Sequence, residues 1–247
     1  MKRVLVIPDL QLPYEDKKSL NAVEQYMGDH EWDEVIQIGD FMDFDIISSH
    51  NKENLRAISG KTIDKDYEYG NAVLDRWQKL APKAKFTIIE GNHEFRMERY
   101  IDANPVLEGK MEVPGGLNLN RRGIKWIPYW SKGDVYRVGK ASFIHGTYVN
   151  QYHAKKHLEA YDTSVFYGHV HSVQSFSKVQ KKGKPMIAQS LGCLCELNQG
   201  YMRGRPSNWV HAFAVFYIQD NGNFNHFVVQ VVDHKFVSPE GKLYIGK

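Results

Sequence analysis

Residues 89–97 read Ile-Glu-Gly-Asn-His-Glu-Phe-Arg-Met, and this stretch decides how the chain is expected to fold. An apolar run at 86–89 leads into it and a helical pattern follows, so Gly91-Asn92-His93-Glu94 lies where a buried strand opens into a helix. In open α/β sheets, ligands gather at the carboxyl ends of strands, where glycine allows a tight turn. Taken alone, the four residues are also typical of an ordinary polar turn. The rest of the chain decides between these interpretations.

The composition favours one globular domain. The chain has 247 residues, of which 42% are hydrophobic, so we predict a single domain over residues 1–247. Lysine and arginine number 32 against 29 acidic residues, and this small surplus disfavours a protein wrapped in nucleic acid. The sequence has no apolar run of about 18 residues and no signal-peptide pattern at its start. We therefore expect a cytoplasmic protein that does not enter a membrane.

The two cysteines, Cys193 and Cys195, are separated by one residue. In an extended strand they follow one another too closely for an ordinary disulfide, and no further cysteine completes a zinc site. We interpret both as small hydrophobic residues of the core.

Strands and helices alternate in the first half of the chain. Strands are expected at 4–7, 34–38 and 85–89, and helices at about 16–28, 62–80 and 94–103. Residues 44–61 are polar and show no clear period. The alternation is typical of a layered α/β fold.

The segment 105–134 interrupts this alternation and is expected to be an insertion lying over one edge of the sheet. It carries aromatic and arginine side chains: Arg121, Arg122, Trp126, Tyr129 and Trp130. Aromatic rings among arginines can stack on bases and hold phosphates. Alternatively, the tryptophans pack the insertion onto the core. The sequence leaves both interpretations open.

Short strands dominate the second half. A hairpin is expected over 135–144, then strands at 163–167, 173–179, 185–191, 211–218 and 224–232, with turns at 181–184 and 220–223. A helix at about 151–160 places His153 and His157 at the spacing used by zinc proteases, but the glutamate that such enzymes need is missing. We therefore assign both histidines to a solvated helix face.

Residues that can bind metal ions follow five of the expected strands. They are Asp9 and Gln11, Asp40 and Asp43, Asn92 and His93, His145, and His169 and His171. A parallel sheet would gather them along one rim. Carboxylates, imidazoles and an amide suit two divalent ions of the Mn, Fe or Zn type, whereas Mg and Ca prefer oxygen alone. Two ions about 3.5–4 Å apart can clamp a phosphate and deliver hydroxide in line.

In this order the motifs resemble those of the calcineurin-like metallophosphoesterase superfamily. They are Asp9-x-Gln11, Gly39-Asp40-x-x-Asp43, Gly91-Asn92-His93-Glu94, His145-Gly146 and Gly168-His169-x-His171. The resemblance covers residues 9–171 and, as an ordered set, is far more specific than any single motif. It implies an α/β (α+β) fold, a four-layer α/β/β/α sandwich of two mixed sheets flanked by helices.

The resemblance also implies a role for each residue. The first ion would be held by Asp9, Gln11 and His171. Asp40 would bridge to a second ion held by Asn92, His145 and His169. His93 would contact the substrate phosphate or protonate the leaving oxygen, and Asp43 would orient it by a hydrogen bond. Manganese is the expected metal, with iron and zinc as alternatives.

Two positions depart from the pattern of similar proteins. At Gln11 they place a histidine, and a neutral amide oxygen is the poorer ligand for a borderline metal, so the first site would bind its ion weakly or only with substrate present. Similar protein Ser/Thr phosphatases have an arginine directly after the second aspartate, where this chain has Phe44. Without that phosphate-binding arginine, a phosphoprotein substrate is disfavoured.

We therefore predict a two-metal phosphoesterase that leans to diesters of a nucleotide or nucleic acid, with a metal-bound hydroxide as nucleophile and His93 as general acid. A dianionic monoester gains more from two full metal sites than a monoanionic diester does. The alternatives are a phosphomonoesterase, acting on a small metabolite or a protein, and a non-catalytic scaffold. Candidates to contact a polyanion are Arg121, Arg122, Lys155, Lys156 and residues 181–184, although scattered lysines are usually a solvated face.

Overall fold

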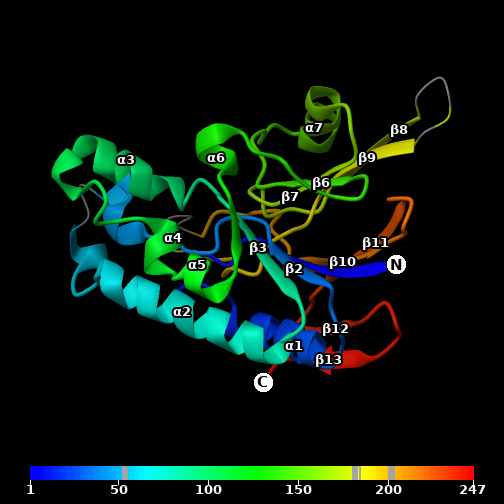
Figure 1. Ribbon diagram of the computed structural model, residues 1–247, viewed down its shortest axis with the longest axis horizontal. Helices are drawn as coiled ribbons and strands as arrows, with labels where there is room; N and C mark the ends of the chain where they lie inside the picture. The colour runs from blue at the N-terminus through cyan, green and yellow to red at the C-terminus, as the bar shows by residue number, and fades with distance from the viewer. Residues whose placement is uncertain (52–54, 180–182, 184, 200–203) are drawn as a thin grey trace.

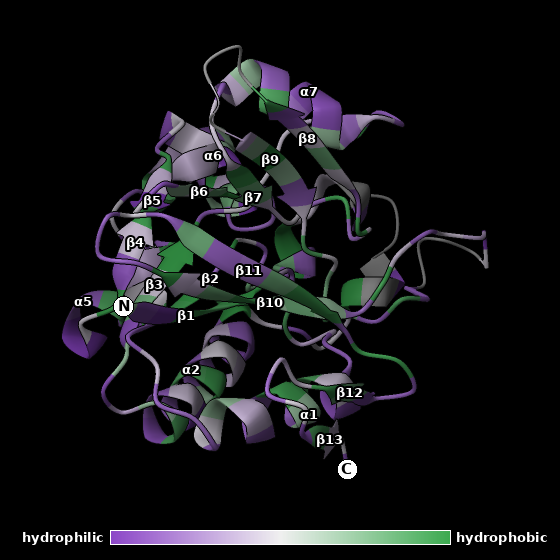
Figure 2. Cartoon of the chain, turned by 90° about the vertical axis from the view of Figure 1, so that its right-hand side faces the viewer, coloured by the Kyte–Doolittle hydropathy of each residue, from purple (hydrophilic) through white to green (hydrophobic). Residues whose placement is uncertain are grey.

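Two stacked β-sheets form the centre of the protein, and helices cover the outer face of each (Figure 1). The computed structural model describes residues 1–51, 55–179, 183, 185–199 and 204–247. Figure 2 shows the layers from the side, with α1 and α2 under one sheet and α7 above the other. The predicted four-layer sandwich of two mixed sheets is confirmed.

The first sheet has six strands, and its four neighbouring strands β1 to β4 run parallel. In spatial order the strands are β11 (Phe224–Gln230), β10 (Ala212–Ile218), β1 (Lys2–Ile7), β2 (Glu34–Gln37), β3 (Lys85–Ile89) and β4 (Lys125–Ile127). β10 is antiparallel to both of its neighbours. The carboxyl ends of β1, β2 and β3 therefore meet at one edge of this sheet.

The second sheet has five strands with a parallel centre. In spatial order they are β5 (Tyr136–Val138), β6 (Ala141–Ile144), β7 (Val165–Tyr167), β9 (Pro185–Ser190) and β8 (Ser175–Val179). β6, β7 and β9 are parallel, while β5 and β8 pair antiparallel at the edges. Residues that follow β6, β7 and β9 therefore also emerge at a common edge.

The longer helices are α1 (Lys17–Gly28), α2 (Ile63–Leu80), α3 (Phe95–Ala103) and α7 (His153–Tyr161). Shorter turns are α4 (Val113–Gly116), α5 (Leu119–Arg122), α6 (Tyr129–Lys132), η1 (Asp45–Ile47), η2 (Ser49–Asn51), η3 (Leu55–Ile58) and η4 (Pro105–Leu107). Side chains cap the two long helices under the first sheet: Asp16 accepts a hydrogen bond from the Ser19 amide, and Thr62 accepts one from the Lys65 amide. Such caps each stabilise a helix by about 1 kcal/mol.

Strand β1 shows how one strand serves two cores. Its side chains alternate, so Leu5 and Ile7 pack in the cluster that α1 and α2 cover, while Val4 and Val6 pack between the sheets. All four are fully buried. Burying each such side chain contributes about 1.5–3 kcal/mol, so a strand that is apolar on both faces is held firmly between the layers.

Two elements differ from expectation. Residues 125–127 of the segment 105–134 form the edge strand β4, so this segment extends the sheet rather than only lying over it. A C-terminal hairpin of β12 (Lys235–Val237) and β13 (Leu243–Ile245) was not predicted. The expected turn at 181–184 lies largely outside the described residues, because only Gly183 belongs to them.

One prediction about α7 is wrong: His153 and His157 are buried, not solvated. The His157 ring stacks on Tyr167 of β7 with centroids 3.8 Å apart, and its Nε2 accepts a hydrogen bond from the Thr147 amide. Burial lowers the pKa of His157 to about 4. The histidine face of α7 is thus the face that packs on the second sheet, with its polar atoms bonded inside the protein.

None of the helices in the described ranges is long and apolar enough to cross a membrane.

Asp66, near the start of α2, is a buried carboxyl group whose burial is not offset by a full set of hydrogen bonds. Asp66 is 6% exposed, and its Oδ2 has no hydrogen-bond partner in the described part of the chain. Burial, with the nearby charges of Asp45 and Asp43, raises the pKa of Asp66 to about 6. Because the folded state holds this proton more tightly than the unfolded chain, the stability that Asp66 contributes is fully present below its unfolded pKa and is lost as the pH rises through about 6.

We predict that Asp66→Asn raises the free energy of unfolding at pH 8 by about 1–2 kcal/mol, since it removes an ionised group from this site. The gain should shrink at pH 4.5, where the folded carboxyl is already protonated. Urea unfolding at both pH values measures this effect. Asp64→Asn, in the same helical turn but exposed, is the control. Equal loss of stability at both pH values would contradict the prediction.

Candidate metal centre

The loops after β1, β2, β3, β6 and β7 bring the predicted polar residues to one rim of the sandwich. Four of these residues have positive φ angles: 51° at Gln11, 52° at Asp40, 66° at His169 and 57° at His171. This left-handed conformation costs a non-glycine residue about 1–2 kcal/mol. Strain of this kind persists only where the surrounding structure enforces it, and it concentrates at functional sites.

The first group of potential ligands consists of Asp9, Asp40 and His171, whose ligand atoms lie within 4.8 Å of one another. His171 Nε2 is 3.3 Å from Asp9 Oδ1. Asp9 Oδ2 is buried and has no hydrogen-bond partner among the described residues. A Cβ atom at Gly168 would lie 2.1 Å from this oxygen, so glycine is what leaves room for it. A buried carboxylate oxygen without a partner suits a bound cation.

The second group consists of Asp40, His145 and His169, so Asp40 belongs to both groups. His145 Nε2 lies 3.3 Å from Asp40 Oδ1 and 3.0 Å from Asn92 Oδ1. The other nitrogen, His145 Nδ1, is 3.1 Å from the carbonyl of Ile38 and must donate to it, because a carbonyl only accepts. This bond turns Nε2 toward the shared carboxylate, as in histidines that bind metals.

Charge compensation dominates the electrostatics of this centre. Burial alone raises the pKa of Asp40, but the His145 and His93 rings outweigh it and hold that pKa well below its usual value. Burial lowers the pKa of His145, but the nearby Asp40 carboxylate raises it by more, so the pKa is about 9. Burial and the neighbouring His145 lower the pKa of His169 to about 3, so His169 is neutral. A cation among these groups would displace the His145 proton, which links metal binding to proton release.

The donor set therefore suits divalent cations. Oxygen and nitrogen atoms are mixed, and the two groups share one carboxylate. Among the described residues, Asp9 Oδ2 is buried without a hydrogen-bond partner. Imidazole with carboxylate is the combination that manganese, iron and zinc accept.

Gln11 lies in the centre, but its oxygen is engaged elsewhere. Its Oε1 accepts a hydrogen bond from Gln199, while its Nε2 is 3.4 Å from His93 Nε2 and 3.5 Å from His171 Nε2. The amide would have to turn over and leave Gln199 to present oxygen to a cation. This arrangement gives the expected weakness of the first group a structural reason.

His93 and Asp43 form the predicted pair, with His93 Nδ1 3.1 Å from Asp43 Oδ2. The contact is an ion-pair contact rather than a well-aligned hydrogen bond. Arg96 was not predicted to take part: its Nη1 donates to Asp43 Oδ1 at 2.9 Å, and its Nη2 is 3.1 Å from His93 Nε2. Burial raises the pKa of Asp43, but His93 and Arg96 lower it by more, so the net pKa lies below its usual value and the carboxylate is ionised.

Glu94 fixes the backbone of the centre. Its Oε2 accepts hydrogen bonds from the amides of Asp40 and Gly91, and its Oε1 accepts one from Met42. It thus joins the loop after β2 to the loop after β3. Burial and Asp40 raise the pKa of Glu94 to about 8. Its position in the Gly-Asn-His-Glu motif was the only sequence signal for this role.

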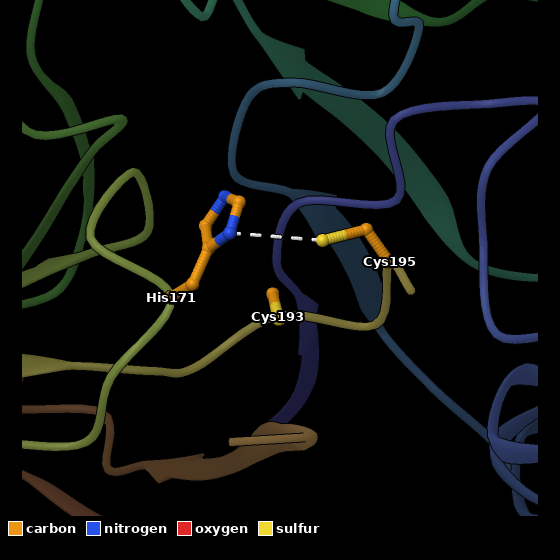
Figure 3. Close-up of side chains that lie close together, drawn as sticks. All are labelled: His171, Cys193 and Cys195. Atoms are coloured by element: carbon orange, nitrogen blue, oxygen red, sulfur yellow. Dashed lines mark hydrogen bonds between the residues drawn. The ribbon is translucent and has the colours of Figure 1, made fainter. Parts of the chain in front are cut away.

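Cys193 and Cys195 are fully buried and free, as expected for core residues, but they also lie against the centre. Figure 3 shows Cys195 Sγ beside His171 Nδ1, at 3.7 Å. With His171 they form a third group of potential ligand atoms. Burial and Cys193 raise the pKa of Cys195 well above its usual value, so it is a thiol. Because these residues follow β9, a sixth strand end reaches the centre, which sequence reasoning missed.

A cleft of about 400 Å³ adjoins the centre and is lined by Ser48, Ser49, Asn92, Phe95, Arg96, Arg99 and Trp130. The Trp130 ring lies 5.2 Å from the His169 ring and 5.8 Å from the His145 ring, measured between centroids. The expected polyanion contacts lie elsewhere: Arg122 is bonded to Asp75 and Lys155 pairs with Glu159. Lys181, Lys182 and Lys184 are outside the described residues.

Comparison with known proteins identifies relatives over the whole chain. No protein-family model matches. The Gene 54 protein of Mycobacterium phage L5 is 25% identical over 254 residues, which cover 98% of both chains. The Gene 54 protein of Mycobacterium phage D29 is 25% identical over 231 residues, which cover 89% of this chain and 90% of that protein.

Among solved structures, Vacuolar Protein Sorting 29 from Cryptosporidium parvum superposes with a TM-score of 0.50 at 14% identity, covering 99% of this chain and 96% of that one. At this identity the match concerns the fold alone. That protein has the calcineurin-like metallophosphoesterase fold. The chain therefore has the fold of the calcineurin-like metallophosphoesterase superfamily, as its ordered motifs implied.

Proposed function

We propose that the protein is a metal-dependent phosphoesterase that prefers phosphodiesters of nucleotides or nucleic acids. The observation that carries this proposal is the placement of His93. Its ring stands beside Asp40, the carboxylate shared by both potential ligand groups, and it is paired with Asp43. A scaffold that only binds cations would not need a buried histidine outside the ligand groups.

In this proposal the first ion would be held by Asp9, Gln11 and His171, and the second by Asn92, His145 and His169. Asp40 would contribute its carboxylate to both. Two divalent ions, manganese before iron or zinc, would supply an activated water and neutralise negative charge on the phosphate. The protein contributes the rigid placement of these groups, which the strained loops and Glu94 enforce.

His93 would act as the general acid. Because its Nδ1 faces Asp43, its Nε2 is the atom that faces the centre and can donate a proton to the leaving oxygen. In the structure Arg96 Nη2 is 3.1 Å from the same Nε2, and two donors cannot bond each other. A phosphate oxygen of the substrate would give Arg96 an acceptor and leave Nε2 free to carry the proton.

The diester preference follows from the first ligand group. Gln11 is neutral and its oxygen is bonded to Gln199, so this group binds a cation less firmly than one with an imidazole at that position. A monoester dianion loses more from a weakly held cation than a diester monoanion does. A diester is therefore the better substrate for this centre.

We predict that His93→Ala lowers kcat for a phosphodiester by about 10²–10⁴-fold, because it removes the proton donor. Steady-state kinetics with manganese measures this change. His234→Ala changes a partly exposed histidine that pairs with Asp16 at the start of α1 and belongs to neither ligand group; it is the control and should retain full activity. A decrease in kcat of less than about tenfold in His93→Ala would contradict the role of His93 as general acid.

We also predict that kcat/KM for bis-p-nitrophenyl phosphate exceeds kcat/KM for p-nitrophenyl phosphate when manganese is saturating. Asp40→Asn should abolish both reactions, because both ligand groups lose their shared carboxylate. Faster turnover of the monoester would defeat the diester preference while leaving a phosphoesterase.

Finally, we predict that Gln11→His tightens manganese binding by about tenfold, a gain of about 1.4 kcal/mol, because an imidazole nitrogen replaces the amide. Histidine tolerates the positive φ of this position better than most residues. Titration calorimetry measures the affinity, and Gln151→His, at an exposed position, is the control. Unchanged manganese affinity would show that Gln11 does not limit the first group.

A further inference from the structure

The cleft beside the metal centre has walls of a particular chemistry. Phe95 and Trp130 provide aromatic rings, while Arg96 and Arg99 provide guanidinium groups. Asn92 belongs both to this cleft and to the proposed second ligand set, so the cleft opens directly from the centre. A volume of about 400 Å³ is within the range of sites that enclose a small ligand. The non-reacting part of a substrate would lie here.

Trp130 has different surroundings from the other aromatic residues of the segment 105–134. Tyr129 is buried, and its hydroxyl bonds to Thr147 and Tyr161. Trp126 packs against the core under the first sheet. Trp130 also packs against the core between the sheets, but it is half-buried and lines the cleft beside the His169 ring. Of the two interpretations left open by the sequence, core packing therefore accounts for Trp126 and Tyr129, whereas Trp130 packs on the core and also borders the cleft, where it can contact a ligand.

Arg96 and Arg99 are three residues apart on α3 and therefore share one face of the helix. Arg96 is bonded to Asp43. Arg99 is exposed and makes no hydrogen bond or ion pair in the described part of the chain. A guanidinium group without a partner at the rim of a cleft is well suited to a phosphate, which it can bind through two parallel hydrogen bonds.

We propose that this cleft binds one nucleotide of a single-stranded nucleic acid, with the base stacked on Trp130 and the adjacent phosphate bound by Arg99. The proposal rests on the proposed function for the identity of the reacting phosphate, which lies at the metal centre. A single strand fits better than a duplex because its bases are free to stack on a protein ring. The net charge of only +3 agrees with local rather than extended contacts to the strand.

The test measures binding of a fluorescein-labelled oligothymidylate of eight nucleotides by fluorescence anisotropy. It uses the His93→Ala protein with manganese, so that the strand is hydrolysed slowly. Adding Trp130→Ala should weaken binding by about 5- to 100-fold, the range found for loss of one base–aromatic stack. Trp130→Phe keeps an aromatic ring and should stay within about threefold of the parent, which separates stacking from a folding defect.

Arg99→Ala, at an exposed position that cannot disturb the core, tests the phosphate contact. It should weaken binding and reduce the slope of log affinity against log salt by about 0.7, the value for one contact to a single strand. Arg121→Ala removes an equally exposed arginine outside the cleft and should bind like the parent. Binding that is unchanged in both Trp130→Ala and Arg99→Ala, or equally tight for a duplex of the same length, overturns the proposal.

Hydrolysis of methyl p-nitrophenyl phosphate by the unmodified protein tests the proposed function separately, because this diester carries no base. Hydrolysis together with unchanged oligonucleotide binding in the variants would leave a phosphoesterase and overturn the nucleotide site. Weakened binding in the variants without any hydrolysis would support the nucleotide site and remove the enzyme.

Discussion

The structure depends on keeping the carboxylate of Asp40 ionised while it is 1% exposed. An isolated charge at that depth would cost many kcal/mol, so positive and hydrogen-bonding groups must converge on it. His145 lies 3.3 Å from Oδ1, the His93 amide donates to the same oxygen, and the His93 ring lies 3.6 Å from Oδ2. Two sheets are needed for this convergence, because His145 follows β6 while Asp40 and His93 follow β2 and β3. The centre is therefore complete only when the two sheets are stacked.

The price of this convergence is local backbone strain, which the packing around it must offset. Asp40 and three other residues of the centre adopt positive φ angles. Gly91 lies so close to the Asp40 carboxylate, and Gly168 so close to the Asp9 carboxylate, that neither position has room for a Cβ atom. Glu94 binds three backbone amides of these loops and holds them in place. Its raised pKa shows the same tension, since a second carboxylate must share the site with Asp40. Glu94 thus holds the loops in place and at the same time adds a second carboxyl group beside Asp40.

Much of this could be predicted from the sequence, because each ligand-bearing motif directly follows an apolar run that reads as a strand. The strands ending at 7, 37 and 89 and the capped helices needed only local patterns. Arg96 and Cys195 could not be placed in this way, since their partners Asp43 and His171 lie on other elements. The error over His153 and His157 has the same origin: helical spacing identifies a common face but does not say whether that face is turned to water or to a sheet. The hairpin β12–β13 lacked a distinctive pattern.

The segment 105–134 shows how an edge strand can set the position of a functional side chain. β4 pairs with β3 in register, with Ile127 opposite Ile89, only two residues before the Gly91 turn. The amide of Glu90 donates to Ile127, and the carboxylate of Glu90 accepts bonds from the amide and hydroxyl of Ser131. Ser131 is the residue after Trp130, so the loop that carries Asn92 and His93 also holds the helix that carries Trp130. These hydrogen bonds therefore fix the position of Trp130 relative to Asn92 and His93.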